Sequence, residues 1–143
     1  MRLQIHKETT ARIPRARIQK VFEMIADEEA EPGSRAGVNL IFTTDEHIRL
    51  LNRDFRHKDK ATDVLSFPLE EAGSADATFG EIYVSVETAD RQAATYGGTR
   101  SEEYVRLVCH GLLHLFGYDH MKPDEEAVMK EREERYLSRV WGK

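Results

Sequence analysis

The chain has 143 residues, of which 40% are hydrophobic and 33% charged, and its formal net charge at pH 7 is −5. This length suits a single domain spanning residues 1–143, and no stretch approaches the roughly 18 apolar residues that a membrane span needs. The acidic balance argues weakly against nucleic-acid binding, so the distribution of charge matters more than its sum. We expect neither DNA nor a membrane as partner.

The N-terminus and the cysteine usage both suit the cytoplasm. Residues 1–6 lack the apolar stretch and the cleavage site of a signal peptide. Cys109 is the only cysteine, so we expect no intrachain disulfide, as is usual in a reducing compartment. We therefore expect a cytoplasmic protein.

The first part of the chain predicts two strands, each followed by a helix. Residues 2–6 alternate in polarity, which is typical of a strand, and apolar residues recur at helical spacing within 14–31. A second strand is predicted at 38–43. Thr43 and Glu46 then form a capping-box pattern that predicts the start of a second helix.

The rest of the chain predicts two more strands and three more helices. In order, these are a strand at 62–67, a loop at 70–78, a strand at 79–86, and helices at 87–96, from 99 and at 123–140. Thr99 and Glu102 form the capping box of the helix from 99, which is apolar almost all round and is therefore expected to be buried. The element order predicts an α+β domain in which about five helices pack on a sheet of about four strands.

The most informative segment contains three of the six histidines, His110, His114 and His120, with the spacing H-x3-H-x5-H. Residues four apart on a helix share one face, so His110 and His114 can direct two imidazoles at one point. Gly117 suits the end of that helix, after which the chain can turn back to bring in His120. Three imidazoles with one open position are typical of a catalytic zinc site, although copper, nickel and iron also bind imidazole. The alternative is a buried cluster of hydrogen-bonded histidines.

No side chain is an obvious fourth ligand. Neighbours on a helix point about 100° apart, so Cys109 should face away from the site as a small buried apolar residue. Asp119 and Asp124 are conceivable ligands, but Asp119 more plausibly orients a histidine or caps the turn. Water is then the expected fourth ligand, and zinc lowers the pKa of a bound water to roughly 7, which supplies a hydroxide nucleophile.

The histidine spacing also matches the metzincin protease signature, with one departure. Those proteases carry a general-base glutamate directly after the first histidine, and this chain has Gly111 there. A peptidase would need another base, for which Glu81, Asp119 and Glu125 are candidates. The missing glutamate argues against a peptidase.

The basic residues are densest at 53–60, just before a predicted strand. A metal ion and an arginine together can stabilise the charge that develops on an attacked phosphodiester, and Arg56 lies where a loop could reach over the metal. The alternative is an ordinary solvated surface. In that alternative the basic residues Arg53, Arg56, Lys58 and Lys60 are salt-bridged to Asp54 and Asp59.

Three further side chains have two interpretations each. Phe55 could stack on a base, but its spacing from Leu51 favours a core position. Ser66 and Tyr118 could donate hydrogen bonds to a transition state, but packing or turn roles are favoured.

Three segments together resemble the bacterial YbeY family of rRNA-maturation endoribonucleases. The histidine run resembles the family's H-G-L-L-H-L-x-G-Y-D-H signature, residues 56–68 its R-x-K-D-x-x-T-[DN]-V-L-S-F-P run, and residues 80–85 its G-D-I-x-I-S strand. The resemblance covers about 38–122 in detail, and the whole chain in length and element order. His57 stands where glycine is common in the family and Glu81 where aspartate is common, and neither departure removes a ligand.

The resemblance implies an α+β fold with a mixed four-stranded sheet and one zinc ion (Zn2+) per chain, bound by His110, His114 and His120. It implies an endoribonuclease specific for single-stranded RNA that acts in 16S rRNA 3′-end maturation and ribosome quality control. The implied partners are rRNA, the ribosomal small subunit and its assembly factors. Arg56 and His114 are the residues expected to be needed for catalysis.

Three functions therefore compete on the sequence. The leading hypothesis is a zinc-dependent endoribonuclease, which the three histidines, the missing protease glutamate and the basic segment support together. The second is a zinc metallopeptidase. The third is a ribosome-associated assembly factor whose metal site is mainly structural.

Overall fold

A computed structural model describes residues 1–69 and 78–142 of the chain. The loop predicted at 70–78 lies outside the described residues, except for Thr78, which begins a strand. Every strand and helix that the sequence predicts is present, in the predicted order.

The sheet is mixed and has four strands in the order β1-β2-β4-β3. These strands are β1 (Arg2–Lys7), β2 (Gly37–Thr43), β3 (Val64–Pro68) and β4 (Thr78–Ser85). Strands β1, β2 and β4 run parallel to one another, whereas β3 is antiparallel to β4. Strand β3 therefore forms one edge of the sheet, and the site described below lies along that edge.

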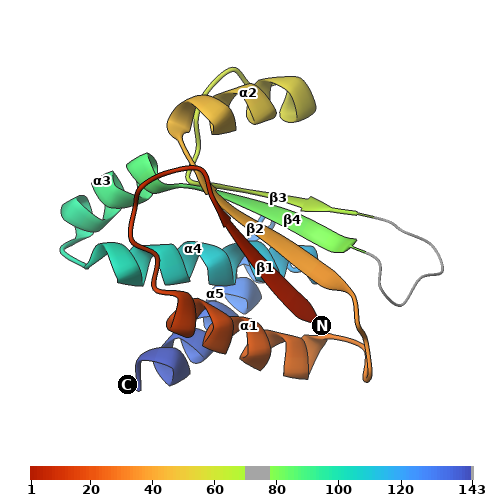
Figure 1. The fold of residues 1–143 in the computed structure, drawn as a ribbon. Helices are drawn as coiled ribbons and strands as arrows, with labels where there is room; N and C mark the ends of the chain where they lie inside the picture. The colour runs from red at the N-terminus through yellow and green to blue at the C-terminus, as the bar shows by residue number, and fades with distance from the viewer. Residues whose placement is uncertain (70–77, 143) are drawn as a thin grey trace.

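Five helices accompany the sheet and divide between its two faces (Figure 1). They are α1 (Arg15–Glu29), α2 (Asp45–Arg56), α3 (Val86–Tyr96), α4 (Arg100–Leu115) and α5 (Pro123–Trp141). Helices α1, α4 and α5 lie on one side of the sheet and α2 lies on the other. The predicted α+β domain with a mixed four-stranded sheet and five helices is thus confirmed.

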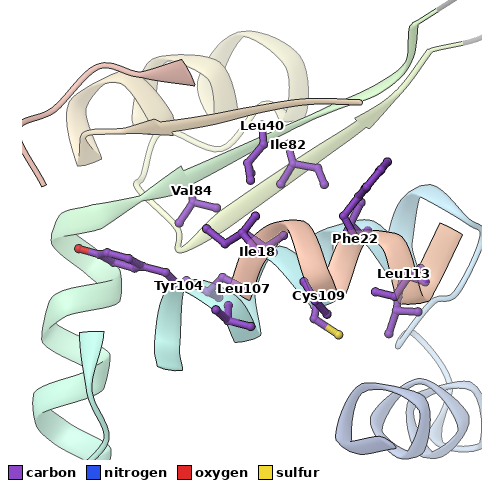
Figure 2. Close-up of a cluster of buried hydrophobic side chains, with 14 of the residues drawn as sticks. Ile18, Phe22, Leu40, Ile82, Val84, Tyr104, Leu107, Cys109 and Leu113 are labelled. Atoms are coloured by element: carbon purple, nitrogen blue, oxygen red, sulfur yellow. The ribbon is translucent and has the colours of Figure 1, made fainter. Parts of the chain in front are cut away.

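The core lies between the sheet and the helices α1 and α4 (Figure 2). Ile18 and Phe22 of α1 meet Leu40 and Ile82 of the sheet, and all four side chains are almost completely buried. Helix α4 passes through the middle of this core and is apolar nearly all round, as predicted. Packing on several sides therefore fixes the position of α4, and with it the positions of the two histidines on this helix.

The sequence predicts capping boxes at the starts of α2 and α4, and the structure contains the one at α4. Thr99 accepts the amide of Glu102 at 3.1 Å and the Glu102 carboxylate accepts the amide of Thr99 at 3.0 Å, which completes the predicted capping box of α4. Thr43, in contrast, ends β2, and the neighbouring Thr44 caps α2 by accepting the amide of His47. The predicted Thr43–Glu46 capping box was therefore wrong: the N-cap lies one residue later, and the residue three positions after it, His47, has no carboxylate to complete a box.

Within residues 1–69 and 78–142, no helix combines the length and the apolar character that crossing a membrane requires.

Candidate metal centre and its cleft

The first two histidines of the site lie one turn apart near the C-terminal end of α4. The Nε2 atoms of His110 and His114 are 3.1 Å apart, and the centroids of their rings are separated by 4.7 Å. Because α4 is held on several sides by the core, both rings project from a rigid support into the half-buried region beside β3. As predicted from their spacing of four residues, the two histidines direct their imidazoles to one point.

A glycine turn brings the third histidine to the same place. Gly117 adopts a φ of +98°, and the amide of Tyr118 donates to the carbonyl oxygen of Leu113 at 3.0 Å, which closes α4 and reverses the chain. The ring centroid of His120 then lies 5.6 Å from that of His110 and 4.9 Å from that of His114. One ring nitrogen from each of the three histidines lies within 4.8 Å of the others. This group could bind a metal ion.

The protonation state of His114 also favours metal binding. Burial lowers the pKa of His114, and the neighbouring His110 and His120 lower it further. The imidazole of His114 is therefore neutral at pH 7 and has a lone pair to give to a cation. A metal needs that neutral form, so the residues present fit such a group.

The other candidate ligands take structural roles. Cys109 is buried, and burial raises the pKa of its thiol, so it behaves as the predicted small apolar residue. The carboxylate of Asp119 accepts the amide of His120 at 2.7 Å and so caps the turn. Asp124 lies in the first turn of α5. Within the described part of the chain, the three histidines form this group without a carboxylate or a thiolate.

Gly111 explains why the protease glutamate is absent. A Cβ atom at this position would lie 2.8 Å from Cγ2 of Ile82 and 3.1 Å from Oγ of Ser66. Position 111 thus faces the sheet at van der Waals contact, so no side chain fits there without displacing β4 or β3. Glu81, one of the other bases considered, is in β4 between Gly80 and Ile82, which face α4, so its side chain points to the opposite face of the sheet.

The histidines form one wall of a cleft of about 1040 Å³ that runs along β3. The opposite wall comes from the end of α2 and the segment that follows it. Its basic lining residues are Arg56, Lys58 and Lys60, and Thr62, Ser66 and Pro68 continue the lining along β3. The structure therefore brings the predicted Arg56 and the predicted metal ligands to one cleft.

The sequence suggested that Arg56 lies on a loop, but in the structure it is the last residue of α2. Its guanidinium donates to the carbonyl oxygen of Ser66 at 2.8 Å and lies over the ring of Phe67 at 5.3 Å from the centroid. These two contacts hold the guanidinium against the edge strand, and Arg56 contributes to the lining of the cleft.

Asp63 and Asp119 also line the cleft, whereas the acidic residues within the basic segment pair with arginines outside its lining. Asp54 pairs with Arg53 at 3.0 Å, and Asp59 pairs with Arg49 of α2. No carboxylate among the described residues forms an ion pair with Arg56, Lys58 or Lys60. Among the described residues, these three cations therefore add positive charge to the cleft without an ion-pair partner. The alternative of a salt-bridged surface holds for Arg53, which pairs with Asp54.

Phe55 is not a core residue, so that expectation was wrong. Its side chain is 64% exposed, and its ring centroid lies 5.7 Å from that of Phe67 on the edge strand β3. Because the buried residues of α2 are Ile48 and Asn52, its apolar face continues toward Phe55 but runs beyond the core at the last turn. An aromatic ring next to Arg56 is thus left open to solvent.

Ser66 and Tyr118 take the packing roles that the sequence favoured. The hydroxyl of Ser66 donates to the carbonyl oxygen of Gly111 at 3.2 Å, and the hydroxyl of Tyr118 donates to Glu29 of α1 at 2.8 Å. Both side chains therefore brace the walls of the cleft.

The sequence analysis missed Glu133 of α5, whose carboxylate lies behind His110. A signal for it was present in the sequence. Glu133 is four residues after Met129 and three before Tyr136, both of which are buried, so it occupies the buried face of α5. A glutamate on such a face is rare unless it has a partner.

The fold and the site define a small α+β protein whose cleft combines three convergent histidines with three basic residues. The family described as Endoribonuclease YbeY matches residues 4–141, and the chain belongs to this family. Its relatives include Endoribonuclease YbeY of Listeria welshimeri, 48% identical over 105 residues that make up 64% of this chain and 65% of the relative. Endoribonuclease YbeY of Anaeromyxobacter dehalogenans is 42% identical over 92% of this chain and 65% of the relative. Both alignments thus span a little under two thirds of the relative's length.

The fold is similar to that of a solved protein as well. A Thermotoga maritima protein with a known solution structure superposes with a TM-score of 0.68 at 32% sequence identity, covering 98% of this chain and 89% of that one. The backbone at position 57 is one that favours glycine. His57 has a φ of 60° and caps α2 in the left-handed conformation, which glycine adopts without strain.

Proposed function

We propose that this protein is a zinc-dependent endoribonuclease that cuts single-stranded RNA and acts in the 3′-end maturation of 16S rRNA and in ribosome quality control. The observation that carries the proposal is the cleft itself, which is lined both by His110, His114 and His120 and by Arg56, Lys58 and Lys60, three cations without an ion-pair partner among the described residues. A cleft with this charge suits a polyanion, and family membership makes RNA the preferred polyanion.

The residues of the cleft divide the chemistry between them. The three histidines would hold Zn2+, which when bound supplies a Lewis acid and a nucleophilic hydroxide at neutral pH. The guanidinium of Arg56 would bind two oxygens of the scissile phosphate and balance the negative charge that grows there during attack. Lys58 and Lys60 would bind flanking phosphates, because their flexible ammonium groups suit a backbone of variable path.

Phe55 supplies a surface for a base. Its exposed ring lies one residue from Arg56, and single-stranded nucleic acids bind to proteins by stacking unpaired bases on aromatic rings beside basic residues. A duplex keeps its bases stacked inside and gains nothing from this ring, which favours single-stranded RNA.

The location of the histidines supports a catalytic rather than a structural metal. His120 is exposed and the site lines an open cleft, whereas α4 is held by the core independently of the histidines. A peptidase receives no support, because Gly111 leaves no space for the general base of that class. The 16S rRNA substrate, the contacts with the ribosomal small subunit and its assembly factors, and the cytoplasmic location are parts of this proposal.

The test is cleavage of a labelled single-stranded fragment spanning the 3′ end of 16S precursor rRNA by highly purified, zinc-loaded protein. The same fragment annealed to its complement is the control. We expect cleavage of the single strand only. Equal cleavage of strand and duplex, or no cleavage of either, would contradict the proposal.

A further inference from the structure

Glu133 of α5 approaches the metal site from the side opposite the cleft. Its Oε1 atom lies 3.6 Å from Nδ1 of His110, and its side chain is only 14% exposed. Both atoms are buried, and neither has a hydrogen-bond partner among the residues that the structure describes. Buried polar atoms without partners are costly, so two that face each other at this distance form a natural donor–acceptor pair.

The orientation of His110 assigns a role to each of its ring nitrogens. Nε2 faces Nε2 of His114 at 3.1 Å and so belongs to the ligand group, whereas Nδ1 faces Glu133. A neutral imidazole carries one proton, and a carboxylate at Nδ1 keeps that proton there and leaves the Nε2 lone pair for a cation. Ligating histidines in metalloproteins commonly have such an acceptor behind them.

An ion pair with Arg106 also orients the carboxylate of Glu133. Nη1 of Arg106 lies 3.9 Å from Oε1 of Glu133, and the guanidinium of Arg106 also binds both oxygens of Glu103 at 2.9 and 2.6 Å. Arg106 therefore offsets the charge of Glu133 without a hydrogen bond of its own to Oε1. Charges of alternating sign thus connect Glu103, Arg106 and Glu133 across the packed helices α4 and α5.

We infer that Glu133 is a positioning residue of the metal site: its carboxylate accepts the Nδ1 proton of His110, fixes the tautomer that presents Nε2, and strengthens metal binding. This inference rests on the metal site proposed above. Glu133 itself touches neither the metal nor the RNA.

The experiment measures the affinity of the purified full chain for Zn2+ by competition with a chromogenic chelator. Glu133→Ala should lower the affinity about 10- to 100-fold, and Glu133→Gln should lower it less because its amide oxygen still accepts. Glu134→Ala changes an exposed residue of the same helix and should leave the affinity unchanged. An unchanged affinity in a folded Glu133→Ala protein overturns the inference.

A second measurement covers the case in which Glu133→Ala does not fold. In zinc-loaded wild-type protein labelled with ¹⁵N-histidine, NMR should show a slowly exchanging proton on Nδ1 of His110. In Glu133→Gln that proton should exchange faster. An unprotonated Nδ1 in the wild type overturns the inference while leaving the metal site intact, whereas a wild-type protein that binds no Zn2+ overturns the metal site and the inference together.

Discussion

The hydroxyl of Ser66 donates a hydrogen bond of 3.2 Å to the carbonyl oxygen of Gly111, which ties the edge strand β3 to the helical turn between His110 and His114. Strand and helix approach so closely here because residue 111 has no side chain. This contact fixes β3 relative to the helical turn that carries the metal ligands. Arg56 donates to the carbonyl oxygen of the same Ser66, so its position relative to the histidines is fixed as well.

The first prediction follows from this contact. Gly111→Ala should lower the free energy of unfolding by about 1–3 kcal/mol, because overpacking a tight core forces strand or helix to shift. Gly98→Ala is the matched control, since a Cβ there would meet only Glu102 Oε1 at an ordinary 3.7 Å. Urea denaturation compares the two, and equal stability of the two variants would show that α4 and β4 are packed less closely than described.

The second prediction concerns Arg56. Arg56→Ala should retain zinc binding but lose about 10²-fold or more in the rate of RNA cleavage, because a donor to the developing phosphate charge is removed. Arg56→Lys should recover little, since an ammonium lacks the planar fork.

Arg53→Ala is the control for this prediction, because Arg53 is already paired with Asp54 and lies outside the cleft lining. Single-turnover cleavage measures all three variants. If Arg53→Ala and Arg56→Ala lose the same activity, the effect comes from general charge and not from the position of Arg56.

The site illustrates what the sequence can predict. The three histidines were found because helix periodicity and one glycine turn, both local features, determine where they point. The partner of His110 was not found, because Glu133 is distant in sequence and reaches the site only through the packing of α5 on α4. Phe55 was placed wrongly for a related reason: periodicity gives the face of a helix but not the point at which the sheet beneath it ends.

Phe55 gives the third prediction. Phe55→Ala should raise KM for single-stranded RNA with a smaller effect on kcat, because a base stacked on an aromatic ring contributes about 1–3 kcal/mol to binding. Tyr96→Ala removes an even more exposed aromatic ring, 80% accessible, at the end of α3 and should have no effect. A KM that stays constant in Phe55→Ala would remove this ring from the RNA path.

His57 gives the fourth prediction, which concerns stability alone. His57 caps α2 at a φ of 60°, and the left-handed conformation costs an ordinary residue about 1–2 kcal/mol. His57→Gly relieves that cost but adds freedom to the unfolded chain, so the net gain should be at most about 1 kcal/mol. Thermal unfolding measures it, and a lower Tm for His57→Gly would mean that the imidazole contributes contacts that outweigh the strain.

The most direct test of the central claim compares the wild-type protein with His114→Ala and with His6→Ala, all purified identically. His6 is exposed on β1, so the last variant controls for the loss of a histidine far from the cleft. Zinc content and cleavage of labelled single-stranded rRNA are measured on the same samples. The account predicts one zinc per chain and cleavage for the wild type and His6→Ala, and neither for His114→Ala. Undiminished cleavage by a zinc-free His114→Ala protein would contradict it.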